Sequence, residues 1–260
     1  MKKIFINYLY KPVSSFFQNI FRTRFQTDMY MSQVQVVSKI HKETFGKYKN
    51  INWGKDVAII GTGPSLNKYK LLPDTVINIG LNSAICNTNL KLDYLFVQDY
   101  NGLKKCLPAI EKTENVIKFY GCIPHHFYGL KESNLKDAII PESIINKHFA
   151  NKYFVYCKYP YYPISFNPNI DYTWLADGGS VAFSAIQFAL YTNPKRIYLI
   201  GCDCSNGYYN TDNKKIKIDK KYLNSWKELK KFADTYYPDT EIISVNPVGL
   251  RGLFTDLDQE

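Results

Sequence analysis

Short apolar runs alternate with longer amphipathic stretches from residue 52 onward. The runs are rich in β-branched and aromatic residues, a composition that favours strands. They are apolar at nearly every position instead of every second one, which predicts strands covered on both faces, as in a parallel sheet. We place these strands at residues 57–60, 75–80, 94–97, 116–120, 153–157, 196–201 and 241–245.

Two helices stand out between those strands. The stretch 178–192 is apolar nearly all round, so we expect it to be buried against the sheet, whereas 222–237 is apolar on one face. Strands that alternate with helices indicate the α/β class. The sequence therefore predicts a single Rossmann-like domain over residues 51–260, with a mostly parallel sheet of about seven strands.

Residues 1–50 differ from the rest in composition. They contain nine Lys or Arg residues against Asp28 and Glu43, so they carry +7 of the net charge of +10. Their apolar residues recur at helical spacing beside Arg22 and Arg24, which predicts a basic, aromatic helical extension. Such a helix packs on the main domain or on a second copy in a homo-oligomer, or it makes peripheral contact with the inner membrane.

Charge and cysteine content exclude several classes of protein. The other residues carry only +3, and no DNA or RNA recognition motif occurs, which argues against nucleic acid as a partner. The six cysteines lack metal-ligand spacing and are typical of a reduced, cytosolic protein. The start "MKKIFINYLYKPVSSFFQNIF" lacks the apolar core of a signal peptide, and no run is long enough to span a bilayer. We therefore expect a cytoplasmic location, peripheral on the inner membrane if the extension touches lipid.

The candidate chemistry begins at "IIGTGPSL", which follows the first strand. Gly61 and Gly63 permit a tight turn and a close approach of backbone to ligand. A dinucleotide fingerprint would have a third glycine in place of Leu66 and an acidic residue in place of Asn82, and the P-loop lysine is absent. NAD enzymes and P-loop NTPases are therefore disfavoured. The turn is either a ligand site or a plain connection from strand to helix.

More polar segments follow other strands of the predicted sheet. Carboxyl ends of parallel strands meet at one edge, which is where open α/β sheets bind ligands. The backbone N–H groups at the start of the buried helix also suit an anion. The segments are Asn82-Ser83, the stretch from Gln98 and Asp99 to Gly102, Gly179-Ser180, and the stretch from Gly201 to Tyr209. Their convergence favours a ligand site over a plain turn.

The order and spacing of these motifs resemble a known family. "IIGTGPSL", the asparagine after the second strand and "GGSVAFSAIQFAL…KRIYLIGCDCSNGYY" are similar to the bacterial α-2,3-sialyltransferases of lipooligosaccharide synthesis. They also resemble the related domain of 6-hydroxymethylpterin diphosphokinases and flagellin glycosyltransferases. The resemblance covers residues 56–254, but only the first turn and the block from Ser180 to Tyr209 are specific.

The resemblance implies a CMP-linked sugar as donor and a glycan or glycolipid as acceptor. Tyr208 and Tyr209 would donate to the leaving phosphate, since a phenol is a neutral donor to developing charge. Neither a metal nor a cofactor besides the nucleotide-sugar substrate is expected. To the substrate contacts that the resemblance implies we add Gln98 and Asp99, which follow the third strand. The predicted substrate contacts are then Gly61, Thr62, Gly63, Ser65, Asn82, Gln98, Asp99, Gly179 and Ser180.

The sequence departs from the family pattern in three places. Thr62 stands where the family has asparagine, and Ser205 stands where it has its first phosphate-binding tyrosine. The family's general-base histidine follows the sixth strand, but this chain has no histidine beyond His148.

Other residues are therefore candidates for the base. His125 and His126 follow a strand, and a carboxylate can accept the proton of an acceptor hydroxyl, which adds Asp177 and Asp203. We select His126 and Asp203 as the catalytic candidates. Asp203 has a structural alternative, because an aspartate can bond to nearby backbone.

These observations predict a glycosyltransferase of bacterial surface-glycan synthesis. It would transfer a sialic or related nonulosonic acid from a CMP-linked donor by direct displacement without a metal. One alternative is a pterin pyrophosphokinase that uses ATP and Mg²⁺, which needs carboxylates to hold the metal. The other is a nucleotide- or glycan-binding domain without catalysis.

Overall fold

The computed structural model describes residues 35–122, 142–150, 152–157, 165–209, 217–218 and 220–259. Residues 1–34 of the predicted extension lie outside the described residues, as do His125 and His126. Residues 210–216 and 219, in the lysine-rich stretch 208–222, lie outside them as well.

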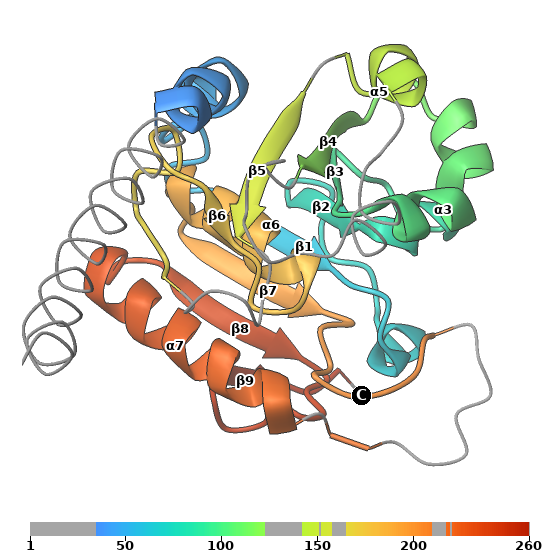
Figure 1. Ribbon diagram of the computed structural model, residues 1–260. Coiled ribbons are helices and arrows are strands. Elements are labelled where there is room, and N and C mark those ends of the chain that lie inside the picture. The colour runs from blue at the N-terminus through green and yellow to red at the C-terminus, as the bar shows by residue number, and fades with distance from the viewer. Residues whose placement is uncertain are drawn as a thin grey trace, which may run out of the picture.

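The described residues form one sheet of nine strands, in which every neighbouring pair is parallel. The α/β class and the parallel sheet predicted from the sequence are confirmed. The strand order is β6-β5-β4-β3-β2-β1-β7-β8-β9, so the chain crosses from one side of β1 to the other before β7 (Figure 1). The strands are β1 (Asp56–Ile60), β2 (Ile77–Leu81), β3 (Tyr94–Val97), β4 (Ile117–Cys122), β5 (Tyr153–Cys157), β6 (Leu175–Ala176), β7 (Arg196–Ile200), β8 (Glu241–Val245) and β9 (Thr255–Leu257).

The expected count of about seven strands is two too few. The missed strands are the two-residue β6 and the three-residue β9. All three residues of β9 are exposed, and its sequence is Thr-Asp-Leu. β6 is apolar but only two residues long, and β9 has one apolar residue, so neither forms a run that periodicity can recognise.

Helices cover both faces of the sheet (Figure 1). The alternation within β1 defines the faces: Val57 and Ile59 belong to one buried cluster and Ala58 and Ile60 to the other. The first cluster includes residues of α6 and α7, and the second includes residues of α3. The labelled helices are α3 (Tyr100–Lys112), α5 (Glu142–His148), α6 (Val181–Tyr191) and α7 (Lys220–Tyr236), with the short 3₁₀ helices η2 (Gly46–Tyr48), η3 (Pro64–Lys68) and η4 (Asn82–Cys86), and helical residues 35–45 precede η2.

The two helices predicted from the sequence are present with shifted starts. α6 begins at Val181 because the Ser180 side chain caps it, accepting from the Ala182 N–H. Every residue of α6 is buried, as its apolar composition predicts. In the described part of the chain, no helix is long and apolar enough to cross a membrane.

Residues 35–50, which the sequence analysis placed in the extension, pack into the domain. A helix spans 35–45, and Phe45 and Tyr48 belong to the same buried cluster as α6. His41 of this helix is fully buried and bridges two distant segments. Its Nδ1 lies 2.7 Å from the Ile170 carbonyl, and its Nε2 accepts from the Val155 N–H at 2.7 Å.

Candidate functional site

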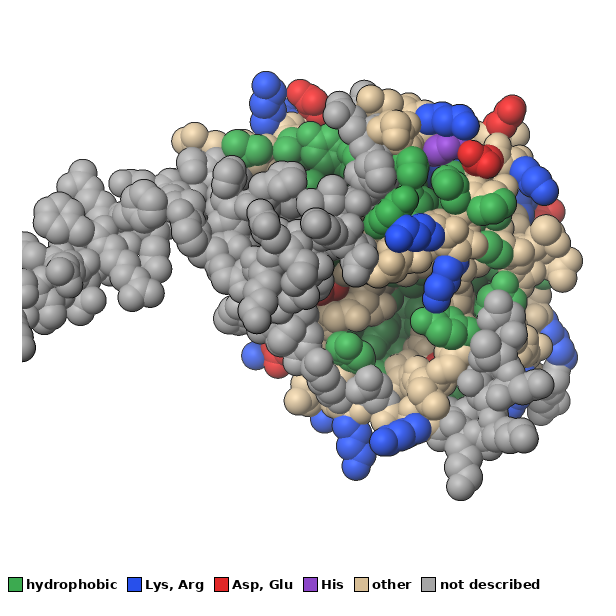
Figure 2. Space-filling view, turned by 45° about the vertical axis from the view of Figure 1, so that its right-hand side comes forward, with side chains coloured by type: hydrophobic (Ala, Val, Ile, Leu, Met, Phe, Trp, Pro, Cys, Tyr) green, Lys and Arg blue, Asp and Glu red, His purple; other side chains and the backbone are tan. Residues whose placement is uncertain are grey.

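A cavity of about 370 Å³ opens at the carboxyl ends of β1 and β7. This is where the strand order reverses, the usual place for a ligand in an open parallel sheet. Figure 2 shows a hollow in the molecular surface with hydrophobic side chains in its depth. The cavity is lined by Gly61, Thr62, Gly63, Leu81, Asn82, Gly179, Ser180, Val181, Ala182, Phe183, Gly201, Cys202, Asp203, Cys204, Ser205, Asn206, Gly207, Tyr208, Tyr222 and Trp226.

The first turn contributes Gly61, Thr62 and Gly63 to the cavity wall. A Cβ atom on Gly61 would lie 2.5 Å from the Gly201 carbonyl oxygen, and one on Gly63 would lie 2.5 Å from Asp203 Oδ2. Real Cβ atoms do not approach so closely. The glycine pair is therefore required by the close contact of the first turn with the loop after β7, whether or not a ligand is bound.

Asp203 joins these two loops. Its Oδ2 accepts from the Ser65 N–H at 2.7 Å, and its Oδ1 accepts from the Ser65 hydroxyl. Its own backbone carbonyl accepts from the Gly249 N–H at 2.9 Å. Burial raises the pKa of the Asp203 carboxyl, and the two bonds from Ser65 oppose that rise. The structure thus places Asp203 on the cavity wall but with its carboxylate turned to Ser65, which is itself not part of the wall.

The start of α6 forms another part of the wall. Gly179 has a φ of +91°, and a Cβ atom there would lie 2.0 Å from the Tyr222 ring. Ser180 follows as the N-cap. The N–H groups of the first turn of α6 and the positive end of its dipole therefore lie beside the cavity.

Among the described residues, two tyrosines line the cavity, but they are not the pair that the sequence suggested. Tyr208 lines it and is 52% exposed. Tyr209 donates its backbone N–H to the Thr62 carbonyl at 2.9 Å, while its side chain packs against the other buried cluster. Tyr222, near the start of α7, occupies the wall together with Trp226. The sequence did not predict Tyr222 or Trp226 as residues of the cavity wall. Helical periodicity assigned Trp226 to the core and gave no signal for Tyr222.

Of the segments after β2 and β3, the first lines the cavity and the second supports it from behind. Asn82 lines the cavity with a φ of +45°, and its Oδ1 accepts from the Gln98 N–H at 3.3 Å. The Gln98 side chain donates to Asp177, which is 4% exposed. Asp99 caps α3 by accepting from the Gly102 N–H at 2.7 Å. Gln98 and Asp99 are therefore not on the wall but lie behind it.

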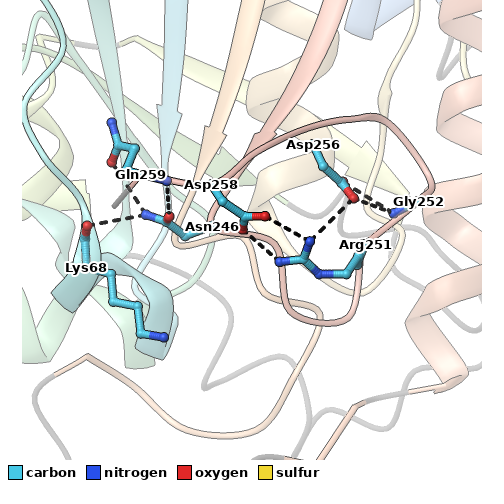
Figure 3. Close-up of polar contacts among 7 residues, drawn as sticks. All are labelled: Lys68, Asn246, Arg251, Gly252, Asp256, Asp258 and Gln259. Atoms are coloured by element: carbon cyan, nitrogen blue, oxygen red, sulfur yellow. Dashed lines mark hydrogen bonds and ion pairs between the residues drawn. The ribbon is translucent and has the colours of Figure 1, made fainter.

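The C-terminal segment supports the first turn from outside (Figure 3). Asn246 Nδ2 donates to the Lys68 carbonyl at 3.3 Å, and Asn246 Oδ1 accepts from the Gln259 N–H at 2.8 Å. Arg251 makes paired bonds to Asp258 at 3.0 and 2.7 Å. These contacts tie β9 to η3 and do not reach the cavity.

The wall has little formal charge. Among its described residues Asp203 is the one acidic side chain, and none is Lys, Arg or His. Neither His41 nor His148 belongs to it. Among the described residues, no group of three or more His, Cys, Asp or Glu side chains is arranged to hold a metal ion. An anion in this cavity would therefore meet neutral donors on its described walls.

Comparisons with known proteins find a similar fold but no similar sequence. No family profile matches the chain, and no curated protein is significantly similar in sequence. The MAf glycosyltransferase from Magnetospirillum magneticum AMB-1 has a similar structure over 86% of this chain, with 15% identity and a TM-score of 0.50. The chain spans 38% of the length of that protein. The Campylobacter jejuni sialyltransferase CstII matches over 78% of this chain and 85% of its own, with 16% identity and a TM-score of 0.44. The likeness to the MAf protein shows a shared α/β fold.

Proposed function

We propose that this chain is a glycosyltransferase that uses a nucleotide-sugar donor and a glycan acceptor in bacterial surface-glycan synthesis. One observation carries the proposal: the first turn, Asn82, the start of α6 and Tyr208 line a single cavity of about 370 Å³. That volume lies at the small end of ligand pockets and suits a mononucleotide. The donor that the sequence resemblance favours is a CMP-linked nonulosonic acid.

The chemistry proposed for the cavity is direct displacement at the anomeric carbon. The acceptor oxygen forms the new bond to that carbon as the bond to the donor phosphate breaks, and the electron pair leaves on the phosphate. Donors that are fixed before the reaction stabilise such charge with little reorganisation. The start of α6 and the hydroxyls of Tyr208 and Tyr222 are the groups that we propose for this role.

The proton of the acceptor hydroxyl must pass to a base. Asp203 and His126 remain the predicted candidates. For Asp203 to act as the base, the hydrogen bond from the Ser65 hydroxyl to Asp203 Oδ1 would have to break. Its raised pKa favours holding a proton, which suits a base better than an ordinary surface carboxylate would.

The pterin pyrophosphokinase alternative is less well supported by the same geometry. Asp99 caps a helix, Asp177 accepts from Gln98, and Asp203 accepts from Ser65. All three carboxylates are thus already engaged with protein donors. A magnesium site would require at least one of them to exchange its partner.

Nucleotide binding tests the proposal directly. Thermal unfolding is measured with CMP, CDP, UDP, GDP and ATP, each with and without Mg²⁺. A nucleotide at a hundred times its Kd should stabilise by about 3 kcal/mol, which raises the Tm by roughly 5 °C in a chain of this size. We expect this shift with CMP and no requirement for Mg²⁺. A shift that occurs only with ATP and Mg²⁺ would favour the pyrophosphokinase, and no shift with any nucleotide would refute a nucleotide site.

The role of the tyrosines is tested with a matched pair on one helix. Tyr222→Phe removes a hydroxyl from the cavity wall, whereas Tyr236→Phe removes one from an exposed side chain of α7 outside the wall. If the Tyr222 hydroxyl stabilises the leaving phosphate, Tyr222→Phe should lower kcat about 10²-fold with a much smaller change in CMP affinity. The Tyr236→Phe variant should match the wild type. A loss of CMP affinity with kcat unchanged would show that the hydroxyl serves binding alone.

A further inference from the structure

An exposed tryptophan stands at the opposite end of the sheet from the cavity. Trp53 is 77% exposed and Ile51 is 48% exposed, in the connection between η2 and β1. We call residues 47–55 the basic turn, because Lys47, Lys49 and Lys55 are all exposed within it. Trp53 is the most exposed of the large apolar side chains among the described residues, and with Ile51 it forms an apolar pair ringed by lysines, the arrangement in which an exposed apolar surface is informative.

The exposure of Trp53 does not come from a loose loop. The Asn50 N–H donates to the Tyr191 carbonyl at 3.2 Å, and the Asn52 N–H donates to the Thr192 carbonyl at 3.0 Å. The Asn52 side chain, 2% exposed, donates to the Thr192 hydroxyl at 3.0 Å. These bonds anchor the basic turn to the end of α6. Trp53 is therefore held outward by a rigid frame.

Further bonds within the turn complete that frame. The Trp53 N–H donates to the Asn50 carbonyl at 3.2 Å, and the Lys55 N–H donates to the Asn52 carbonyl at 2.9 Å. Gly54 has a φ of +73°, which lets the chain reverse directly after the tryptophan. The turn thus presents two apolar side chains at fixed positions.

The charge around the basic turn is positive. Lys195 is exposed next to it, since its N–H donates to the Lys55 carbonyl at 2.7 Å. The acidic neighbours are Asp56, which forms an ion pair with Arg196 at 2.7 Å, and Glu241, whose N–H donates to the Lys195 carbonyl. Among the described residues, the four lysines Lys47, Lys49, Lys55 and Lys195 outnumber the nearby carboxylates for which no ion pair is seen, Glu241 and Asp239.

We propose that the basic turn docks on an anionic lipid surface, with Trp53 and Ile51 in the interfacial layer and the lysines at the headgroups. Tryptophan favours the boundary between headgroups and acyl chains, because its ring is apolar and its N–H is polar. Lysines near an anionic bilayer add attraction that salt screens. This surface is independent of the proposed chemistry. It lies beyond the amino end of β1, a strand of five residues that is about 17 Å long, so the cavity faces away from the bilayer.

Vesicle binding by the full chain tests the docking surface. Sedimentation is measured with phosphatidylcholine vesicles and with vesicles that also contain phosphatidylglycerol. The double variant Trp53→Ser with Ile51→Ser should bind the anionic vesicles at least about tenfold more weakly, since it loses most of the exposed aromatic area. Leu71→Ser is the matched control, because Leu71 is 68% exposed on a different segment. Lys49→Glu with Lys55→Glu should weaken binding by roughly fivefold or more for each lysine.

Quenching of Trp53 fluorescence by lipid distinguishes lipid binding through the basic turn from lipid binding through residues 1–34. Vesicles with brominated acyl chains should quench the fluorescence of the wild type, and the quenching should largely disappear in Trp53→Phe. The other two tryptophans are Trp226, which is 4% exposed, and the partly buried Trp174, and the quenching that remains in Trp53→Phe measures their contribution. Binding without quenching of Trp53, or equal binding by the double variant, would overturn the proposal. Self-association that the double variant abolishes without lipid would overturn it in favour of a second copy. Nucleotide binding should be unchanged in these variants, so the two proposals fail separately.

Discussion

Acid should destabilise this protein through His41. Its side chain is fully buried, and burial lowers its pKa from 6.5 to about 4, although bonds to the carbonyls of Ile170 and Thr173 oppose the shift. Nδ1 faces these two carbonyls at 2.7 and 2.8 Å, and Nε2 accepts from the Val155 N–H at 2.7 Å. These contacts suit the neutral imidazole with its proton on Nδ1. Protonation of Nε2 would lose the bond from Val155 and place a charge in the core.

The size of the effect follows from the pKa shift. Between pH 6.5 and 4 the unfolded chain binds a proton at His41 that the native chain does not bind, so stability falls as the pH falls through this window. The shift from 6.5 to about 4 corresponds to about 3 kcal/mol in full, since one pKa unit is worth about 1.4 kcal/mol. Most of this loss should occur between pH 7 and pH 4.5. The contribution is fully present from about pH 7.5 upward, one unit above the unfolded-state pKa.

The assay is urea unfolding followed by tryptophan fluorescence, to which the buried Trp226 contributes, from pH 4.5 to 7.5. His41→Phe removes the titration and keeps the edge contact with Phe45, whose ring centroid lies 5.1 Å from that of His41. At pH 7 the variant should be less stable by roughly 3 kcal/mol, because the Val155 N–H and two carbonyls lose their partner. On acidification the wild type should lose about 3 kcal/mol more than the variant.

Two measurements can contradict this reasoning. If the wild type and His41→Phe lose stability in parallel between pH 7 and 4.5, His41 is not neutral and buried in the native state. His148→Gln serves as the control for the other described histidine, because burial lowers the pKa of His148 as well. Titration of the His41 ring by NMR should give a pKa near 4. A value near 6.5 would refute the proposed environment.

Three substitutions test the framework of the cavity and the sheet by their effect on the free energy of unfolding. Gly179→Ala should destabilise by more than about 2 kcal/mol, because of its φ of +91° and the approach to Tyr222, and adding Tyr222→Ala should recover part of the loss. Gln187→Leu should cost roughly 3 kcal/mol, since the buried Gln187 amide bonds both the N–H and the carbonyl of Ala176 in β6; a near-neutral result would show that β6 holds without it. Asp203→Ala should cost about 2 kcal/mol or more by leaving donors of the first turn unpaired, and an unchanged urea midpoint would contradict that role.

The sequence by itself determined the class of fold, because that information is local. The run at 57–60 is apolar throughout, and a strand of this kind must be covered on both faces. The same holds for α6, which is apolar all round and entirely buried. The sequence also placed Asn82, the Gly179-Ser180 pair and the loop after β7 at one edge, since the carboxyl ends of parallel strands meet there. The structure brings these segments to one cavity.

The direction of each side chain at that edge was decided only by tertiary structure. Ser65 and Asp203 are 138 positions apart, and their bonds turn both side chains toward each other. Tyr208 and Tyr209 are adjacent in sequence, yet only Tyr208 lines the cavity, because the Tyr209 side chain packs into the opposite cluster. Tyr222 reaches the wall because α7 packs against the turn at Gly179. Strand and helix periodicity reports which face of an element is buried, whereas loop side chains are oriented by partners far away in the chain, and no local pattern records those partners.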